Sequence, residues 1–422
     1  MKIKKRKDLI NFLALILFLL TAFLKYFVPS IVTKILPVTA ILLAVVARDK
    51  KRLTMSRGML LFVIFGVFFV FSCFYSSAMQ TGFSDSFSYL FAVAFIILMH
   101  DKRLDWNKTV FFMTVCCCVI NVGTMLQDLN PSLIYGITSR FPYTTEQRFL
   151  VTQWAKNRWF SGLFSDRAPA AFFASMLCAS GMFYLLRNQR LKNIWKKYFG
   201  VLLYSFGIYG IFLTAKRGLL VATVLATLAA YLINRKANGK SILKIVISLS
   251  VISVIAYVII SNLEVARVTV SRFIIDENFD NGRIVRYSAI LDSLRSNFLF
   301  GAGTGSVNEI IGGGGHNIYL TVLLENGVIG ALFFIAVLIM QIKTTISVAF
   351  RLSKLPDSSN YIALVSFSLF LQVFFITYGM SGNPLYDNYI LYYYMIGVLI
   401  NENFHYRLRQ TALGNSNLSL SV

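Results

Sequence analysis

The stretch "MKIKKRKDLINFLALILFLLTAFLK" (residues 1–25) begins with a cluster of basic residues and continues as an almost uninterrupted apolar run. About 20 mostly apolar residues are enough to cross a bilayer as a helix. The run looks like a signal peptide at first, but it has no small-residue cleavage site and carries Lys25. We therefore expect a retained first membrane span over residues 9–28.

The rest of the chain repeats this apolar pattern. Hydrophobic residues make up 57% of the chain and charged residues only 14%, which is typical of an integral membrane protein. About twelve stretches have the length of a span, and they start near residues 9, 30, 58, 82, 108, 168, 198, 218, 242, 317, 360 and 387. The predicted fold is all-α: a polytopic membrane protein with about twelve transmembrane helices.

The net charge of +23 would suggest a nucleic-acid partner in a soluble protein, but its distribution argues against one. If the N-terminus is cytoplasmic, most of the 41 Lys and Arg residues fall in alternate, inner segments. The short outer loops 77–84 and 380–388 carry none. This is the positive-inside bias, and it predicts that both termini are cytoplasmic and that nucleic acid is not a partner.

The predicted organisation is a single integral membrane domain over residues 1–410, followed by a disordered cytoplasmic tail over residues 411–422. Two outer segments, 127–167 and 262–316, are longer than a turn. All five cysteines fall inside predicted spans, where a thiol behaves as a small apolar group.

The second outer segment contains "GRIVRYSAILDSLRS" (residues 282–296), whose apolar spacing predicts a short amphipathic helix on the outer surface. Arg283 and Arg286 are three residues apart and so share one face of this helix. Glycines follow at 301, 303, 305 and 312–315, and they allow the backbone to bend around a ligand.

His316 directly follows these glycines, at the predicted outer end of a span. An imidazole there can exchange a proton near neutral pH. Alternatively, it only anchors a helix end at the headgroup level. Asn317 is suited to cap the helix that begins after it.

Lys216 and Arg217 lie at the predicted outer end of another span, against the positive-inside trend. Either they reach out to headgroup phosphates, or they bind an anionic ligand at the surface. With Arg283 and Arg286 on the same side, a diphosphate is the natural ligand, because arginine holds phosphate oxygens bidentately.

Acidic residues are scarce. Asp276, Glu277 and Asp280 form a cluster that could hold a divalent cation, although a solvated loop explains it equally simply. Glu325 falls inside a predicted span, where a carboxylate is expensive and needs a partner. We expect a structural hydrogen bond there, with a role in the site as the alternative.

Together these residues resemble the signature region of the O-antigen ligase and polymerase family. "FGAGTGSVNEIIGGGGHNIYLTVLLENGVIGALFF" (residues 300–334) is similar to its glycine-rich stretch, followed by His-Asn, an aromatic residue, a leucine and an acidic residue before Gly-x-x-Gly. "LTAKRGLLVATVLATL" resembles the family's arginine-bearing span, although serine more often stands in the place of Lys216. "NGRIVRYSAIL" resembles its Gly-Arg segment. "NRWFSGLFSDRAPAAFFA" resembles an earlier motif that usually ends in Pro-Asn, and this departure affects Arg167.

The resemblance implies a glycosyltransferase in the cytoplasmic membrane of a bacterium, acting on its outer face without a metal or other cofactor. The implied donor is a glycan on polyprenyl diphosphate. His316 is the candidate base, and Arg217 and Arg283 are the candidates for stabilising the leaving diphosphate. The other predicted substrate-binding residues are Lys216, Arg286, Arg167, Asn317 and Tyr319.

Three functions remain open on the sequence. The first is a polymerase that joins lipid-linked repeat units of an O-antigen, capsule or exopolysaccharide, with a chain-length regulator as a conceivable partner. The second is a ligase that transfers finished glycan to a lipid core or a protein. The third is a transporter of lipid-linked sugars, which is disfavoured because the sequence shows no repeat and because the candidate charges cluster at one surface.

Overall fold

A computed structural model describes the chain except for residues 1, 49–53, 188–193, 238–281, 357 and 413–422. The described residues form helices and no strand. In chain order the helices are α1 (Lys2–Leu24), α2 (Ser30–Val46), α3 (Arg57–Phe71), the 3-10 turn η1 (Ser72–Tyr75), α4 (Met79–Met99), α5 (Trp106–Leu129), α6 (Pro131–Thr138), α7 (Thr145–Lys156), α8 (Arg167–Arg187), α9 (Ile194–Thr214), α10 (Arg217–Ala237), α13 (Arg283–Leu294), α14 (Val307–Ile311), α15 (Ile318–Leu352), α16 (Ser359–Tyr378) and α17 (Asn388–Ala412).

The membrane-protein prediction is confirmed. Eight of the described helices are long and apolar enough to cross a bilayer, and two further apolar helices are shorter. Each predicted span coincides with a helix, apart from the one near residue 242, which lies outside the described residues. The cytoplasmic placement of the termini stays a prediction, as does the total number of spans.

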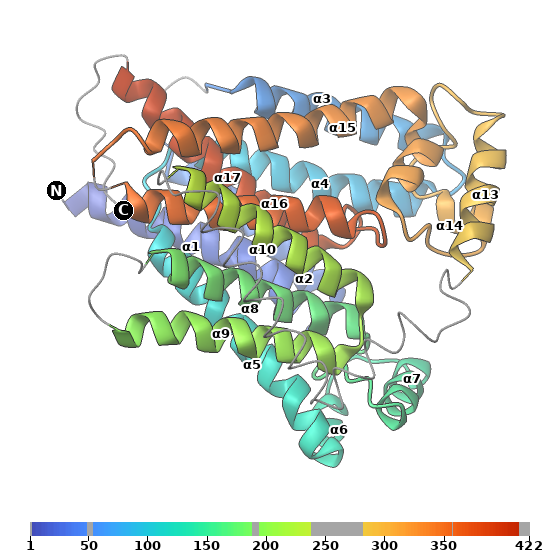
Figure 1. The fold of residues 1–422 in the computed structure, drawn as a ribbon. Coiled ribbons are helices and arrows are strands. Elements are labelled where there is room, and N and C mark those ends of the chain that lie inside the picture. The colour runs from blue at the N-terminus through green and yellow to red at the C-terminus, as the bar shows by residue number, and fades with distance from the viewer. Residues whose placement is uncertain (1, 49–53, 188–193, 238–281, 357, 413–422) are drawn as a thin grey trace.

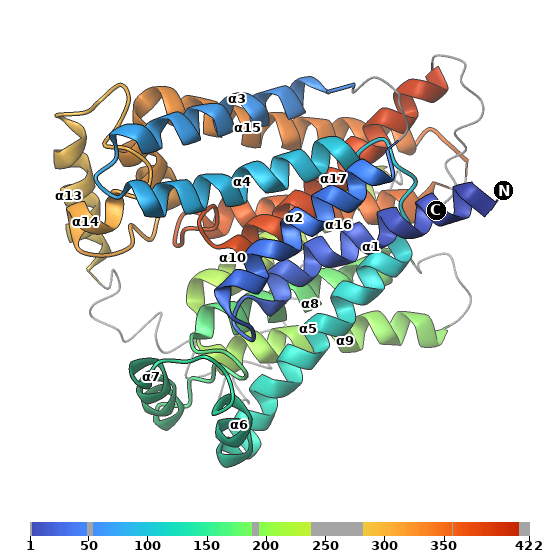
Figure 2. The same cartoon turned by 180° about the vertical axis from the view of Figure 1, so that it is seen from behind.

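The long helices pack side by side into a bundle with two distinct ends (Figures 1 and 2). The described chain starts and stops at one of them, which we call the terminal end. The opposite end carries α13 and α14, and we call it the α13 end. Because α13 runs across the ends of the long helices rather than along them, it has the orientation expected of a surface helix (Figure 1).

Small residues let helices approach closely where the bundle is tightest, between α8 and α9. A Cβ added at Gly181 would lie 2.6 Å from the backbone nitrogen of Tyr204, and one at Gly207 would lie 2.7 Å from the Ala174 carbonyl oxygen. Between membrane helices such close backbone contact replaces the hydrophobic driving force of soluble proteins. Helix α9 ends at Thr214, and Lys216 follows it directly before α10.

The outer segment predicted over residues 127–167 contains two helices that the sequence analysis did not anticipate, α6 and α7. The Asn130 side chain accepts from the backbone nitrogen of Leu133 at the start of α6. At the start of α7, Thr144 and Gln147 form a reciprocal capping box. The segment is therefore an ordered helical projection at the side of the bundle (Figures 1 and 2).

Candidate functional site

Helix α15 is broken at Gly327, where the backbone adopts φ 63° and ψ −171°. Segment 298–303 runs beside the break and forms hydrogen bonds with the backbone groups that the break leaves free. The Ala302 nitrogen donates to the Leu324 carbonyl oxygen (2.8 Å), and the Val328 nitrogen donates to the Phe298 carbonyl oxygen (3.0 Å). A side chain at Gly327 would collide with the Leu299 carbonyl group. The break thus separates a short half-helix at the α13 end, residues 318–326, from the rest of α15.

His316 lies directly before this half-helix, in the left-handed region of backbone space (φ 49°). The predicted cap is confirmed: the Asn317 Oδ1 atom accepts from the nitrogens of Tyr319 (3.0 Å) and Leu320 (3.2 Å). The positive end of the half-helix dipole therefore lies next to the imidazole, which favours an anion at this place. His316 is exposed to solvent on one side.

Helix α13 supports the glycine-rich loop that carries His316. Arg286 donates from Nη1 to the Gly314 carbonyl oxygen (3.4 Å), and the Tyr287 hydroxyl donates to the His316 carbonyl oxygen (3.4 Å). Arg283 is the first residue of α13, one turn before Arg286. The predicted shared face of the two arginines is thus turned towards the histidine loop.

The electrostatics of His316 show which charges surround it. Partial burial lowers the pKa of His316, and the charges of Arg286, Arg283 and Lys216 lower it further, while Asp166 opposes them. Lys216 itself pairs with Asp166, with 3.7 Å between Nζ and Oδ1. The surrounding cations therefore favour the neutral form of the imidazole, which is the form that can accept a proton.

Three charged residues of this end were not assigned to the site by the sequence analysis: Asp166, Asp387 and Lys25. Burial raises the pKa of Asp387 to about 6, Lys25 and Lys216 lower it, and Asp166 raises it. The available signal was an acid in an otherwise uncharged outer loop and a cation at the end of the first span. Carboxylates therefore lie beside the cations and can accept hydrogen bonds from sugar hydroxyls.

Glu325 has the structural role expected of it. It is fully buried, and its Oε1 atom accepts from the Val307 nitrogen (3.2 Å). Its Oε2 atom accepts from the Tyr386 hydroxyl. The carboxylate therefore ties α14 and the turn between α16 and α17 to the half-helix.

Arg217 is the first residue of α10, directly after Lys216. Its neighbour Gly218 packs so tightly on Ser381 that an added Cβ would meet the serine side chain. Ser381 belongs to the turn between α16 and α17, as does Asn383, whose Oδ1 atom accepts from Thr321 of the half-helix (3.4 Å). Arg217 thus begins its helix beside the turn that braces the half-helix.

Two other predicted site residues have partners within the protein. The guanidinium of Arg167 lies over the rings of Trp154 (4.9 Å) and Trp159 (4.6 Å), and its Nη1 atom donates to the Thr214 carbonyl oxygen (3.5 Å). The Tyr319 hydroxyl donates to the Ile376 carbonyl oxygen (2.7 Å). The acidic cluster predicted over residues 276–280 lies outside the described residues.

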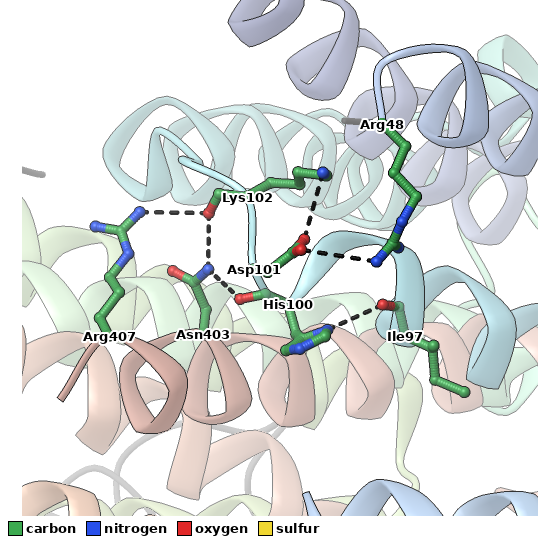
Figure 3. Close-up of polar contacts among 7 residues, drawn as sticks. All are labelled: Arg48, Ile97, His100, Asp101, Lys102, Asn403 and Arg407. Atoms are coloured by element: carbon green, nitrogen blue, oxygen red, sulfur yellow. Dashed lines mark hydrogen bonds and ion pairs between the residues drawn. The ribbon is translucent and has the colours of Figure 1, made fainter. Parts of the chain in front are cut away.

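A second polar cluster lies at the terminal end, between the α4–α5 loop and α17 (Figure 3). The Nδ2 atom of Asn403 donates to the carbonyl oxygens of His100 (2.6 Å) and Lys102 (2.8 Å). Asp101 pairs with Arg48 at 3.8 Å. Burial lowers the pKa of His100. These groups form hydrogen bonds and ion pairs with one another and with the backbone. The cluster therefore joins helices and has fewer groups free to bind a ligand than the α13 end has.

In the described part of the chain, no three His, Cys, Asp or Glu side chains are grouped as a metal site would need. The α13 end instead gathers cations, a neutral imidazole and carboxylates around the start of a half-helix. This set can bind an anionic group and remove a proton from a neighbouring hydroxyl.

Residues 199–335 match the model of the O-antigen ligase family. Among the described helices, this range includes most of α9, all of α10, α13 and α14, and the first part of α15. None of the curated proteins matches the chain significantly. The matched region includes His316, Lys216 and both arginines of α13. Residues 199–335 are thus similar to the O-antigen ligase family, in agreement with the resemblance, and together with the long apolar helices this match supports a multi-pass bacterial membrane protein with a role in glycan transfer.

Proposed function

We propose that the protein is a polymerase that joins lipid-linked oligosaccharide repeat units of an O-antigen, capsule or exopolysaccharide. The donor is a growing glycan on polyprenyl diphosphate, and the acceptor is a hydroxyl of the next lipid-linked unit. The reaction takes place on the outer face of the cytoplasmic membrane. The observation that carries the proposal is that Arg286 and Tyr287 of α13 hold the loop of His316, while Arg286, Arg283 and Lys216 are the cations that lower the pKa of its imidazole.

His316 acts as the general base in this proposal. The acceptor oxygen forms a bond to the anomeric carbon of the donor glycan while its proton passes to the imidazole. The bond between that carbon and the diphosphate oxygen breaks, and the polyprenyl diphosphate leaves with the electron pair. A positioned base of this kind accelerates a reaction by about 10²–10⁴.

Fixed cations stabilise the charge that develops on the leaving diphosphate. Arg283 and Arg217 have this role, and Arg286 and Lys216 bind the same group from the neighbouring positions. Losing one such electrostatic donor typically costs about 3–4 kcal/mol of transition-state stabilisation. This chemistry requires neither a metal ion nor another cofactor.

The remaining predicted residues act through the elements that they hold. Asn317 caps the half-helix and so fixes the orientation of its dipole. Arg167 braces α7 against the end of α9, and Tyr319 joins the half-helix to α16. Their effect on the glycan is therefore indirect, through the shape of the site.

The experiment that tests the proposal uses purified protein in detergent with a defined lipid-linked repeat unit. We expect a ladder of longer lipid-linked products on a gel. Because no membrane separates two compartments there, elongation would also exclude pure transport. Absence of elongation with an otherwise stable protein would contradict the polymerase function.

A ligase is the second candidate, favoured by the family that residues 199–335 match. A deletion strain separates the two functions. Single repeat units attached to the final acceptor indicate a missing polymerase. Accumulated long chains that are still lipid-linked indicate a missing ligase.

A further inference from the structure

Three large apolar side chains stand next to one another on the segment that follows α13. Phe298, Leu299 and Phe300 are 56%, 55% and 52% exposed. Contiguous apolar surface of this kind is unfavourable in water and marks contact with another apolar phase.

The backbone of this segment is held firmly. The carbonyl oxygens of Phe298 and Leu299 accept from the nitrogens of Val328 (3.0 Å) and Ile329 (3.3 Å), directly after the break in α15. The carbonyl oxygen of Phe300 accepts from the Tyr75 hydroxyl (2.7 Å). The three side chains are thus presented outwards from a fixed support.

Helix α3 gives the level of the segment relative to the bilayer. The candidate span Arg57–Tyr75 has 19 residues. At about 1.5 Å per residue this length only just crosses the hydrocarbon core, so Tyr75 must lie close to its boundary. Phe300 contacts Tyr75 and also stacks on Phe68, with 6.5 Å between ring centroids. Phe300 is therefore at this boundary or just inside it.

The apolar surface continues from the segment onto the flank of the bundle formed by α3 and α15, which lie side by side (Figures 1 and 2). Exposed side chains on this flank include Val67 (62%), Phe71 (56%) and Leu332 (63%). Both helices are candidate spans, so their exposed apolar side chains face lipid. The polar residues 295–297 come directly before Phe298 and are exposed at the other edge.

We propose that Phe298, Leu299 and Phe300 form a wedge that inserts into the lipid leaflet at the α13 end. Its partner is the acyl-chain region of the phospholipids, and Arg295 reaches the headgroup phosphates above it. The wedge sets the height of α13 and of the glycine-rich loop over the membrane. If the proposed function also holds, this height keeps Arg283 and Arg286 level with the diphosphate of a lipid-linked donor.

Site-directed nitroxide labelling of the full chain in phosphatidylethanolamine and phosphatidylglycerol vesicles tests the wedge. Leu299→Cys carries the label, and Ser296→Cys is the matched control three residues away. The native cysteines are buried or partly buried, and labelling of the unsubstituted chain gives their background. Oxygen, which concentrates in lipid, should relax the label at 299 more than a water-soluble nickel complex does, and the order should reverse at 296.

Equal access of the nickel complex to both labels would overturn the proposal, because the segment would then lie in water. Protection of the 299 label from both reagents would also overturn it and would indicate a protein partner instead. Phe298→Cys provides a second site if Leu299→Cys does not fold. The readout needs no substrate, so it fails or succeeds independently of the proposed glycan transfer.

Discussion

Replacing His316 by asparagine should remove the proposed base while keeping the local backbone. The effect of the usual alanine substitution would be harder to interpret, because position 316 has a left-handed backbone with φ 49°. An alanine there carries about 1–2 kcal/mol of backbone strain, whereas asparagine tolerates the left-handed region. We expect His316→Asn to lower the elongation rate by about 10²–10⁴, which corresponds to about 3–5 kcal/mol of transition-state free energy.

The assay is single-turnover elongation of a defined lipid-linked repeat unit in detergent, with product length read on a gel. Thermal unfolding of both proteins in the same detergent gives the control, and the two midpoints should agree within a few degrees. Retention of more than a tenth of the wild-type rate by His316→Asn would refute the base assignment. If only the alanine variant lost activity, the position would matter for its backbone and not for its imidazole.

Four further outcomes are expected. The kcat/KM of the wild-type protein should fall as the pH drops through the pKa of His316, because a protonated imidazole cannot act as a base. Since this pKa is lowered, the fall should lie below the ordinary histidine value near 6.5. In Arg286→Gln the loss of a nearby cation raises the pKa of His316, so the fall in kcat/KM should move to higher pH. An unchanged pH profile would argue against electrostatic coupling between Arg286 and His316. Gly327→Ala should lower the unfolding midpoint by forcing a side chain against Leu299 in a backbone region reserved for glycine, at a cost of about 1–3 kcal/mol. Arg217→Lys should reduce elongation by about tenfold or more, since a point charge does not reproduce the bidentate fork, and near-normal activity would remove Arg217 from the diphosphate site.

The spans and the surface helix could be predicted from the sequence because each depends on a local pattern. An apolar run of fixed length decides a span, and the spacing of apolar residues in 282–296 predicted α13. The Asn317 cap likewise follows from a residue type at a helix start. In each of these cases the relevant neighbours are adjacent in the chain.

The missed features depend on contacts between distant residues. Gly327 lies in an apolar run that reads as continuous helix, and only segment 298–303, which satisfies the free backbone groups, makes the break stable. Lys25 and Asp387 come from opposite ends of the chain, so nothing local relates their charges. The contact of Arg167 with two tryptophans likewise becomes visible only in the folded chain, and its substrate-binding role stays a prediction.

The supports of the half-helix have a consequence for biogenesis. Its first nitrogen, that of Ile318, donates to the Gly379 carbonyl oxygen (2.8 Å), and Glu325 is held by Tyr386. Both supporting residues are synthesised long after His316 has left the ribosome. A nascent chain that has inserted α15 but lacks the last two helices already has α13 to hold the histidine loop, but it lacks these two supports of the half-helix. The start of the half-helix therefore receives its full set of contacts only when the last two helices are in place.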